Sequence, residues 1–267
     1  MKAIYISNES LSARKVKKII KKQGKDACFF VLTKNVKQNK KIIKVINKLE
    51  LPICDGRWLF KYLVVQVLEY IEKQQKKKIE EQNLAFMIDS YNEIVEFYIK
   101  YLTNKVKSLK IITEKRNKFK QIENEMFQND GTVLTISNNK RKALKNIDII
   151  INFEYSEEKI NKFAIKDNAI IINLKEKITI ISKRYRGINI NSYDICFSNR
   201  YLEMLEWIKE FENKEIYESY IYGKQNIYNI EKQMIKDNVE IKELIGNRGK
   251  ISKGEYQNIL DKSIYLT

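Results

Sequence analysis

Five short apolar runs, separated by segments with helical spacing, are the feature that most constrains the fold of this chain. The runs are LAFMID (84–89), LKIIT (109–113), TVLTIS (132–137), IDIIIN (147–152) and AIIINL (169–174). Near-continuous Ile, Leu and Val content of this kind is typical of strands that are buried on both faces of a parallel sheet. Since crossover connections are right-handed, we predict an α/β fold with a doubly wound parallel sheet over this region.

A smaller α/β layer is predicted in the residues that precede this sheet in the sequence. Its expected strands are KAIYIS (2–7) and ACFFVL (27–32), and its expected helices are 9–22 and 35–49. An apolar helix that starts near Asp55 and ends in a polar stretch is expected to connect two domains. We therefore predict an N-terminal α/β domain, a doubly wound domain and a helical C-terminal extension that packs back on the first domain, with the boundaries 1–80, 81–195 and 196–267.

Composition excludes several classes of function. The chain has no histidine, which removes His-based proton relays, Ser-His-Asp triads and His-ligated metals. Cys28, Cys54 and Cys196 are odd in number and widely spaced, so we expect reduced thiols and no metal site. There is no apolar run near 18 residues and no apolar signal segment, so we expect a cytoplasmic protein without a membrane partner.

The charge of the chain is strongly positive. The formal net charge is +17, and only eight of the 51 basic residues are arginine. The lysines lie along the whole chain, so we expect a solvated lysine surface and not a dedicated nucleic-acid face. A basic module that binds nucleic acid or another acidic partner stays open as an alternative.

Residues 84–174 resemble the NAD(P)-binding Rossmann domain of two-domain dehydrogenases, and in particular the glutamyl-tRNA reductase and shikimate dehydrogenase group. The resemblance rests on the order of the elements and on two segments, NIDIIINF (146–153) and NAIIINL (168–174), which match the fourth and fifth strands of such domains. It implies that Glu114, after the second strand, binds the adenosine ribose and favours NAD over NADP. Arg116 and Asn152 complete the contacts that the resemblance implies around a cofactor.

The first turn of this domain departs from the pattern of the resembled families. Ser90, Tyr91 and Asn92 stand where glycines would let the backbone approach a pyrophosphate. Asp89 and Glu93 add negative charge at the same place. We therefore expect Ser90, Tyr91 and Asn92 to contact NAD or NADP weakly, or the dinucleotide site to be lost.

No catalytic residue carries over from the resembled families. Cys54, next to Arg57 at a predicted helix start, is the best-placed candidate for a nucleophile, although a small core residue is the favoured interpretation. The leading hypothesis is a dehydrogenase-like Rossmann protein with weakened or lost dinucleotide binding, with or without catalysis. The alternative is an active NAD(P)-dependent oxidoreductase with an atypical phosphate loop. The substrate, a small-molecule partner and a homodimer are left open.

Two further segments combine cations with glycine. They are KRYRG (183–187) and LIGNRGKISKGEY (244–256). The first is weak evidence for a nucleic-acid contact because it is short. The second has the wrong residues for a calcium loop and nothing specific to a helix-turn-helix. We expect it to be a capping element.

Overall fold

The computed structural model describes residues 2–7, 12–23, 27–48, 51–131, 133–198, 209–222 and 226–264. The chain folds into two compact units, each made of two stretches of sequence. The small unit comprises Met1–Leu59 and Asp194–Glu240, and the large unit comprises Phe60–Tyr193 and Ile241–Thr267. No helix among the described residues is long and apolar enough to cross a membrane.

The small unit is built on a three-stranded parallel sheet with β2 in the centre. Its strands are β1 (Lys2–Ile6), β2 (Ala27–Leu32) and β3 (Ile53–Cys54). Its helices are α1 (Ala13–Gln23), α2 (Lys34–Gln38), α3 (Lys40–Asn47), α10 (Asn213–Ile221) and α11 (Ile227–Lys236), with the short α4 (Arg57–Phe60) after β3. The two longer strands and the helical layer after each of them agree with the sequence prediction.

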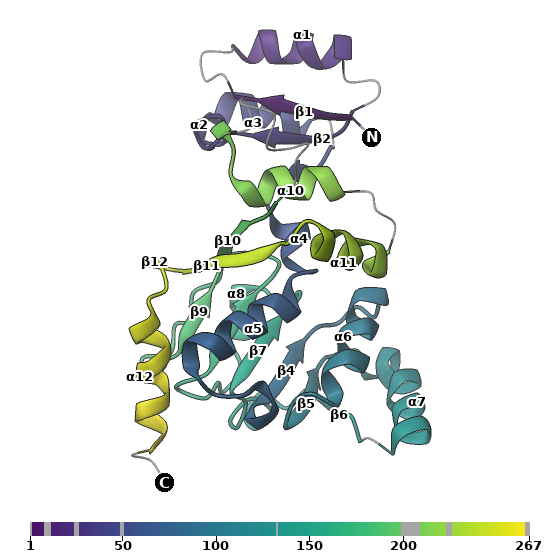
Figure 1. The fold of residues 1–267 in the computed structure, drawn as a ribbon, viewed down its shortest axis with the longest axis vertical. Coiled ribbons are helices and arrows are strands. Elements are labelled where there is room, and N and C mark those ends of the chain that lie inside the picture. Colours follow the sequence, from purple (N-terminus) through teal and green to yellow (C-terminus); the bar gives the residue numbers. More distant parts are fainter. Residues whose placement is uncertain are drawn as a thin grey trace. The chain divides into compact units, whose positions relative to one another are not determined.

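Helices cover both faces of the small sheet. On one face, Val16 of α1, Val36 of α2 and Ile42 of α3 join the buried side chains of β1 and β2 in one apolar cluster. On the other face, α10 contacts β2 and β3. Figure 1 shows α1 and α10 on opposite sides of β1 and β2. The helix expected over 35–49 is interrupted at Asn39, whose side chain accepts hydrogen bonds that begin α3.

The large unit contains the predicted doubly wound sheet. Its six strands are β4 (Asn83–Met87), β5 (Ser108–Ile112), β6 (Thr135–Ser137), β7 (Ile149–Asn152), β8 (Ile170–Asn173) and β9 (Ile188–Ile190). They lie in the order β6-β5-β4-β7-β8-β9, and all neighbouring pairs are parallel. This is the strand order of the Rossmann fold. The prediction of one parallel sheet from the five apolar runs is therefore confirmed.

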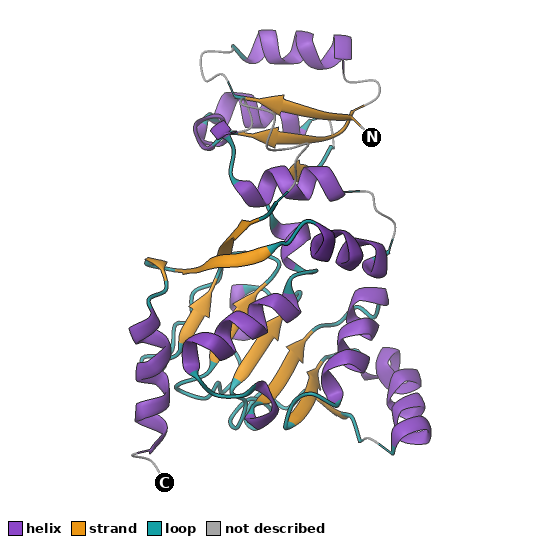
Figure 2. Cartoon of the chain, in the orientation of Figure 1, coloured by secondary structure: helices purple, strands orange, loops and turns teal. Residues whose placement is uncertain are grey.

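The helices of the large unit lie around this sheet (Figure 2). They are α5 (Val64–Gln75), α6 (Glu93–Thr103), α7 (Lys120–Asp130), α8 (Glu157–Ile160) and α12 (Lys253–Ile264). Every residue of β7 and β8 is buried, as expected for central strands with helices on both faces. The core is therefore centred on β4, β7 and β8.

The expected connecting helix is not a connector. It is divided into α4 and α5, and α5 buries an apolar face that includes Val67, Leu68 and Ile71. Because this face needs a partner, α5 belongs to the large unit, where it packs against α12. The compact units therefore meet in sequence at Leu59 and Phe60 and not near residue 80.

The C-terminal extension is not wholly helical and does not return as one piece. Helices α10 and α11 belong to the small unit, whereas the segment after Glu240 belongs to the large unit. There β11 (Glu240–Gly246) and β12 (Gly249–Lys250) form an antiparallel hairpin. Gly249 has a positive φ of 110°, which favours glycine and explains why the chain turns here. Residues 199–208 of the predicted extension lie outside the described residues.

Candidate functional site

The carboxyl ends of β4, β5 and β7 bring most of the predicted site residues to one edge of the sheet. Ser90 and Tyr91 lie in the turn after β4, and Asn92 begins α6. Glu114 follows β5, and Asn152 is the last residue of β7. The strand order reverses between β4 and β7, and open α/β sheets bind their ligands at such a switch point.

The turn after β4 binds the side-chain carboxylate of Glu154. One carboxylate oxygen of Glu154 accepts hydrogen bonds from the backbone N–H groups of Asp89 and Ser90, both at 3.0 Å. The Asn92 side chain accepts a third N–H, that of Val95, at 3.1 Å. In conventional dinucleotide sites the N–H groups of this turn face the pyrophosphate. Here a carboxylate lies against two of them.

Asp89 organises a second group of contacts at the same edge. One of its carboxylate oxygens accepts hydrogen bonds from the Thr113 hydroxyl at 3.0 Å, the Glu114 N–H at 2.8 Å and the Tyr155 hydroxyl at 3.1 Å. The other oxygen lies 2.5 Å from Lys159 Nζ. This lysine also lies 3.0 Å from the Glu114 carboxylate. The expected ribose-binding acid is thus part of an internal ion network.

The charges in this network stabilise one another. Burial raises the pKa of Asp89, but hydrogen bonds from Lys159, the Glu114 backbone and Thr113 outweigh burial, so its pKa lies below the ordinary value. Burial lowers the pKa of Lys159, but Asp89 and Glu114 outweigh it and the pKa lies above the ordinary value. The Lys159 ammonium also lies 3.9 Å from the centre of the Tyr155 ring. The negative charge of Asp89 is therefore matched by a fixed cation and not left to repel a phosphate.

A ladder of asparagine side chains crosses the carboxyl ends of β7, β8 and β9. Asn152 donates to Asn173 Oδ1 at 3.2 Å and also binds both backbone groups of Tyr155. Asn173 donates in turn to Asn191 Oδ1 at 3.0 Å. Asn191 accepts from the Ile178 N–H and donates to its carbonyl. The Asn152 side chain therefore holds the end of β7 through hydrogen bonds within the protein.

Two of the predicted cofactor contacts, Arg116 and Tyr91, form no hydrogen bond or ion pair with Asp89, Glu154 or Lys159 in the part of the chain that the structure describes. Arg116 lies in an exposed short helical turn (Arg116–Phe119) after β5. Tyr91 packs edge-on against Phe119, with ring centres 5.6 Å apart. Burial and a hydrogen bond to Glu96 raise the pKa of Tyr91. Tyr91 is therefore part of the packing of α6 against the region after β5.

Cys54 is not an activated nucleophile. The thiol is buried, and burial together with the nearby Glu218 carboxylate raises its pKa. The Glu218 carboxylate also accepts the backbone N–H groups of Asp55 at 3.1 Å and Leu59 at 2.8 Å. The N–H groups that could have stabilised a thiolate therefore bind this carboxylate. The Cys28 side chain lies outside the described part of the chain.

A cavity of about 510 Å³ lies in the large unit beside β9, which is the strand at one edge of the sheet. It joins the two glycine-containing segments noted in the sequence, 183–187 and 244–256. Among the side chains that line it are Ile180, Tyr185, Arg186, Ile188, Arg248, Ile251, Glu255, Asn258 and Ile259. The sequence alone does not connect the two segments, because nothing in their spacing shows that β9 and the hairpin lie together.

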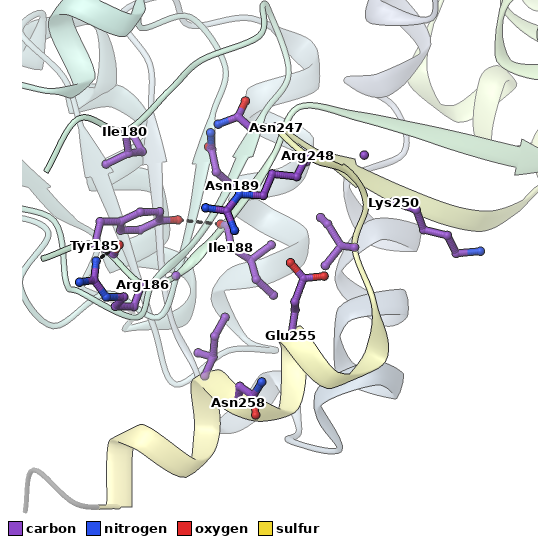
Figure 3. Close-up of a pocket in the computed structure, with 15 residues that line it drawn as sticks. Ile180, Tyr185, Arg186, Ile188, Asn189, Asn247, Arg248, Lys250, Glu255 and Asn258 are labelled. Carbon is purple, nitrogen blue, oxygen red and sulfur yellow. Dashed lines mark hydrogen bonds between the residues drawn. The ribbon is translucent and has the colours of Figure 1, made fainter. Parts of the chain in front are cut away.

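Opposite charges face this cavity. Figure 3 shows the Arg248 guanidinium and the Glu255 carboxylate turned toward the space between the hairpin, β9 and α12, whereas Lys250 points away. Lys250 is paired with Glu243 at 2.6 Å. One oxygen of Glu255 caps α12 by accepting from Ser252. Within the described residues, Arg248 forms no ion pair with Glu255.

The residues that sequence reasoning missed are Glu154 and Lys159. Both follow β7 in sequence, and neither belongs to a motif. One signal was present: in a parallel sheet, residues just after the fourth strand of the Rossmann order face the first turn across the switch point. A carboxylate two residues after β7 is therefore placed near the N–H groups of that turn.

No protein-family model matches this chain, and no curated protein sequence matches it either. Among solved structures, it is similar to a dipicolinate synthase subunit from Bacillus halodurans, with 12% identity and a TM-score of 0.40 over 64% of this chain and 62% of that chain. It is also similar to aspartate transcarbamoylase from Trypanosoma cruzi, with 10% identity and a TM-score of 0.32 over 67% of this chain and 65% of that chain. The match thus spans less than two thirds of the length of either protein. What the chain shares with Rossmann-like α/β proteins is the architecture that its own strand order defines.

Proposed function

We propose that this chain is a dehydrogenase-like Rossmann protein that works without a conventionally bound dinucleotide. The observation that carries the proposal is the Glu154 carboxylate on the N–H groups of Asp89 and Ser90. A pyrophosphate would have to displace this carboxylate and would meet its negative charge. The Asp89–Lys159–Glu114 network adds to the barrier, because Glu114 would have to leave Lys159 to bind a ribose.

Calorimetric titration with NAD and NADP tests this proposal. We expect no binding tighter than about 1 mM for the native protein, which corresponds to roughly −4 kcal/mol. Glu154→Ala frees two N–H groups and removes a negative charge, so we expect it to bind NAD more tightly than the native protein. The matched control is Glu158→Ala, which removes an exposed carboxylate of the same segment that pairs with Lys162.

The alternative of an active NAD(P)-dependent oxidoreductase makes the opposite prediction. It requires Glu154 to swing away when the cofactor arrives, and Glu114 then to bind the adenosine ribose with NAD favoured over NADP. Binding of NAD by the native protein at or below about 1 μM, roughly −8 kcal/mol, would overturn our proposal. In that case Glu114→Ala should weaken NAD binding, which identifies the ribose contact.

A second candidate function is the binding of a small zwitterionic molecule in the cavity beside β9. The favouring observation is that Arg248 and Glu255 face the same space, which isoleucine side chains also line (Figure 3). An Arg can bind a carboxylate in a bidentate manner, and a carboxylate can bind an ammonium group. The volume is within the ordinary range for small-ligand pockets.

Thermal denaturation with each of the common α-amino acids tests this second candidate. At least one should raise the melting temperature of the native protein. The gain should be lost in Arg248→Ala and kept in Arg184→Ala, which removes an exposed arginine outside the cavity lining. If no amino acid stabilises the native protein, the cavity does not serve this class of ligand.

A further inference from the structure

The helices on one face of the small sheet carry only positive charge. The stretches 12–23 and 33–48, which contain α1, α2 and α3, hold eleven lysines and one arginine and no aspartate or glutamate. The chain as a whole has 34 acidic residues. A general enrichment in lysine raises the cation count everywhere but does not remove acids from these three helices. The expectation of an evenly spread lysine surface therefore does not describe this layer.

Two buried acidic residues of the small unit lie on the opposite face of its sheet. Helix α10 contacts β2 and β3 and carries Glu215 and Glu218, both buried. Lys37 reaches from α2 to pair with Glu215. Apart from Lys37, the lysines and the arginine of α1, α2 and α3 whose side chains the structure describes form no ion pair with a described residue.

The spacing of the lysines is the same in both longer helices. Lysines recur at i, i+3 and i+7, which places three of them on one side of a helix over about 10 Å. They are Lys15, Lys18 and Lys22 in α1, and Lys41, Lys44 and Lys48 in and directly after α3. All six are exposed. Helices α1 and α3 pack beside each other on the same face of the sheet, so the six form one surface, which we call the lysine face.

A hollow of about 460 Å³ deepens this surface along α3. Its lining includes Lys40, Lys44 and Lys48, with Asn47 among them. Ammonium groups around a shallow hollow suit the phosphate groups of a polyanion, because each can donate to a phosphate oxygen and keep part of its hydration.

The apolar residues of the layer indicate which polyanion fits. Val16, Ile42 and Ile46 are buried in the unit, and Ile19 is 38% exposed. The described side chains of these helices present no continuous exposed apolar face, so insertion cannot add to the attraction between lysines and an anionic membrane. The stretches 12–23 and 33–48 contain no Phe, Tyr or Trp, so there is no aromatic platform on which unpaired bases could stack.

We propose that the lysine face binds the phosphate backbone of double-stranded nucleic acid without reading its sequence. Lysine contacts to phosphate fix position and supply affinity but carry no base information. This inference is independent of the proposal for the sheet edge, because it rests on the small unit alone.

The test is fluorescence anisotropy with a random DNA duplex of about 25 base pairs at several salt concentrations. With about six phosphates neutralised, the slope of log K against log salt should be about −5, which is roughly a thousandfold loss between 50 and 200 mM salt. The variant Lys41→Gln/Lys44→Gln/Lys48→Gln should bind at least tenfold more weakly and bring the slope to about −3. Single strands of equal length and vesicles with anionic lipids serve as competing partners.

The matched control removes the same number of positive charges from a surface outside the lysine face. Lys142→Gln/Lys145→Gln/Lys183→Gln removes three exposed lysines from the large unit and should change duplex affinity less than twofold. Equal weakening by the two triple variants would overturn the proposal, because net charge and not the lysine face would then control binding. Tighter binding of single strands or vesicles than of the duplex, or no salt-dependent duplex binding, would overturn it as well.

Discussion

Two buried glutamates of α10 show how single residues set the chemistry of the small unit. Glu215 and Glu218 are i and i+3 on one helix and are 1% and 2% exposed. Burial raises the pKa of each to about 7, although Lys37 favours the charged form of Glu215 and the Leu59 N–H favours that of Glu218. In the unfolded chain both would titrate near the ordinary value of about 4.3.

We therefore predict that the small unit becomes less stable as the pH rises from about 5 to about 8. Between the unfolded-state pKa and the folded-state pKa of about 7, the folded state binds more protons than the unfolded state. The free energy of unfolding is therefore highest below the unfolded-state pKa and falls as the pH rises through about 7. Each group can contribute up to about 3 kcal/mol. Glu215→Gln cannot titrate and should show a shallower pH dependence.

Urea unfolding followed by tryptophan fluorescence measures this effect in the small unit. Both tryptophans, Trp58 and Trp207, belong to the sequence of that unit, so the large unit contributes no tryptophan to the signal. Asp89 of the large unit has a lowered pKa, so its contribution is lost only at a lower pH. A free energy of unfolding that rises between pH 5 and pH 8 would contradict the prediction.

At the scale of one element, the start of α6 depends on Asn92. Its side chain accepts the Val95 N–H at 3.1 Å, as an N-cap residue does. Asn92→Ala should lower the free energy of unfolding by about 1 kcal/mol, whereas Asn92→Asp keeps the acceptor and should change it by less than about 0.5 kcal/mol. Urea unfolding followed by circular dichroism is the measurement. Equal values for the Ala and Asp variants would show that the cap contributes nothing.

The asparagine ladder connects three strands, so we expect a substitution in it to lower the free energy of unfolding more than the loss of the Asn92 cap does. Asn173 is fully buried, and its amide donates to Asn191 Oδ1, to Asn189 Oδ1 and to the Ile190 carbonyl. Asn173→Ala leaves buried acceptors without this donor and opens a small cavity, so we expect a loss of about 3 kcal/mol. Asn146→Ala, at an exposed position before β7, should cost less than about 0.5 kcal/mol. Chemical denaturation of both variants measures these two changes in the free energy of unfolding.

At the scale of the whole molecule, each compact unit is closed by a distant stretch of sequence. The small unit needs α10, because this helix contacts β2 and β3, and Ser219 lies 2.8 Å from the Tyr5 hydroxyl. A chain that ends at Tyr193 should therefore lose hydrogen-exchange protection in β1 and β2. It also loses α12, but β4, β7 and β8 keep all their neighbours in the sheet and should stay protected. Protection of β1 and β2 equal to that of the full chain would show that α10 is dispensable.

The periodicity of the sequence by itself determined the sheet of the large unit. Its strands are buried on both faces, so their apolar character is continuous and local, and the parallel order follows from the helices between them. The capping role of Asn92 was equally readable, because an N-cap depends on residues three positions apart. Glu114 was placed correctly after β5 for the same local reason.

Only the tertiary structure decided what the sheet edge holds. Glu154 and Asp89 are 65 residues apart, and their contact exists because β4 and β7 are neighbours in the sheet. The cavity beside β9 and the return of α10 to the small unit also depend on contacts between distant segments. Local spacing fixes which residues share an element, but a hydrogen bond or an ion pair between two elements depends on their position in space. That is why the sequence showed a first turn without glycines but not the Glu154 carboxylate that lies against its N–H groups.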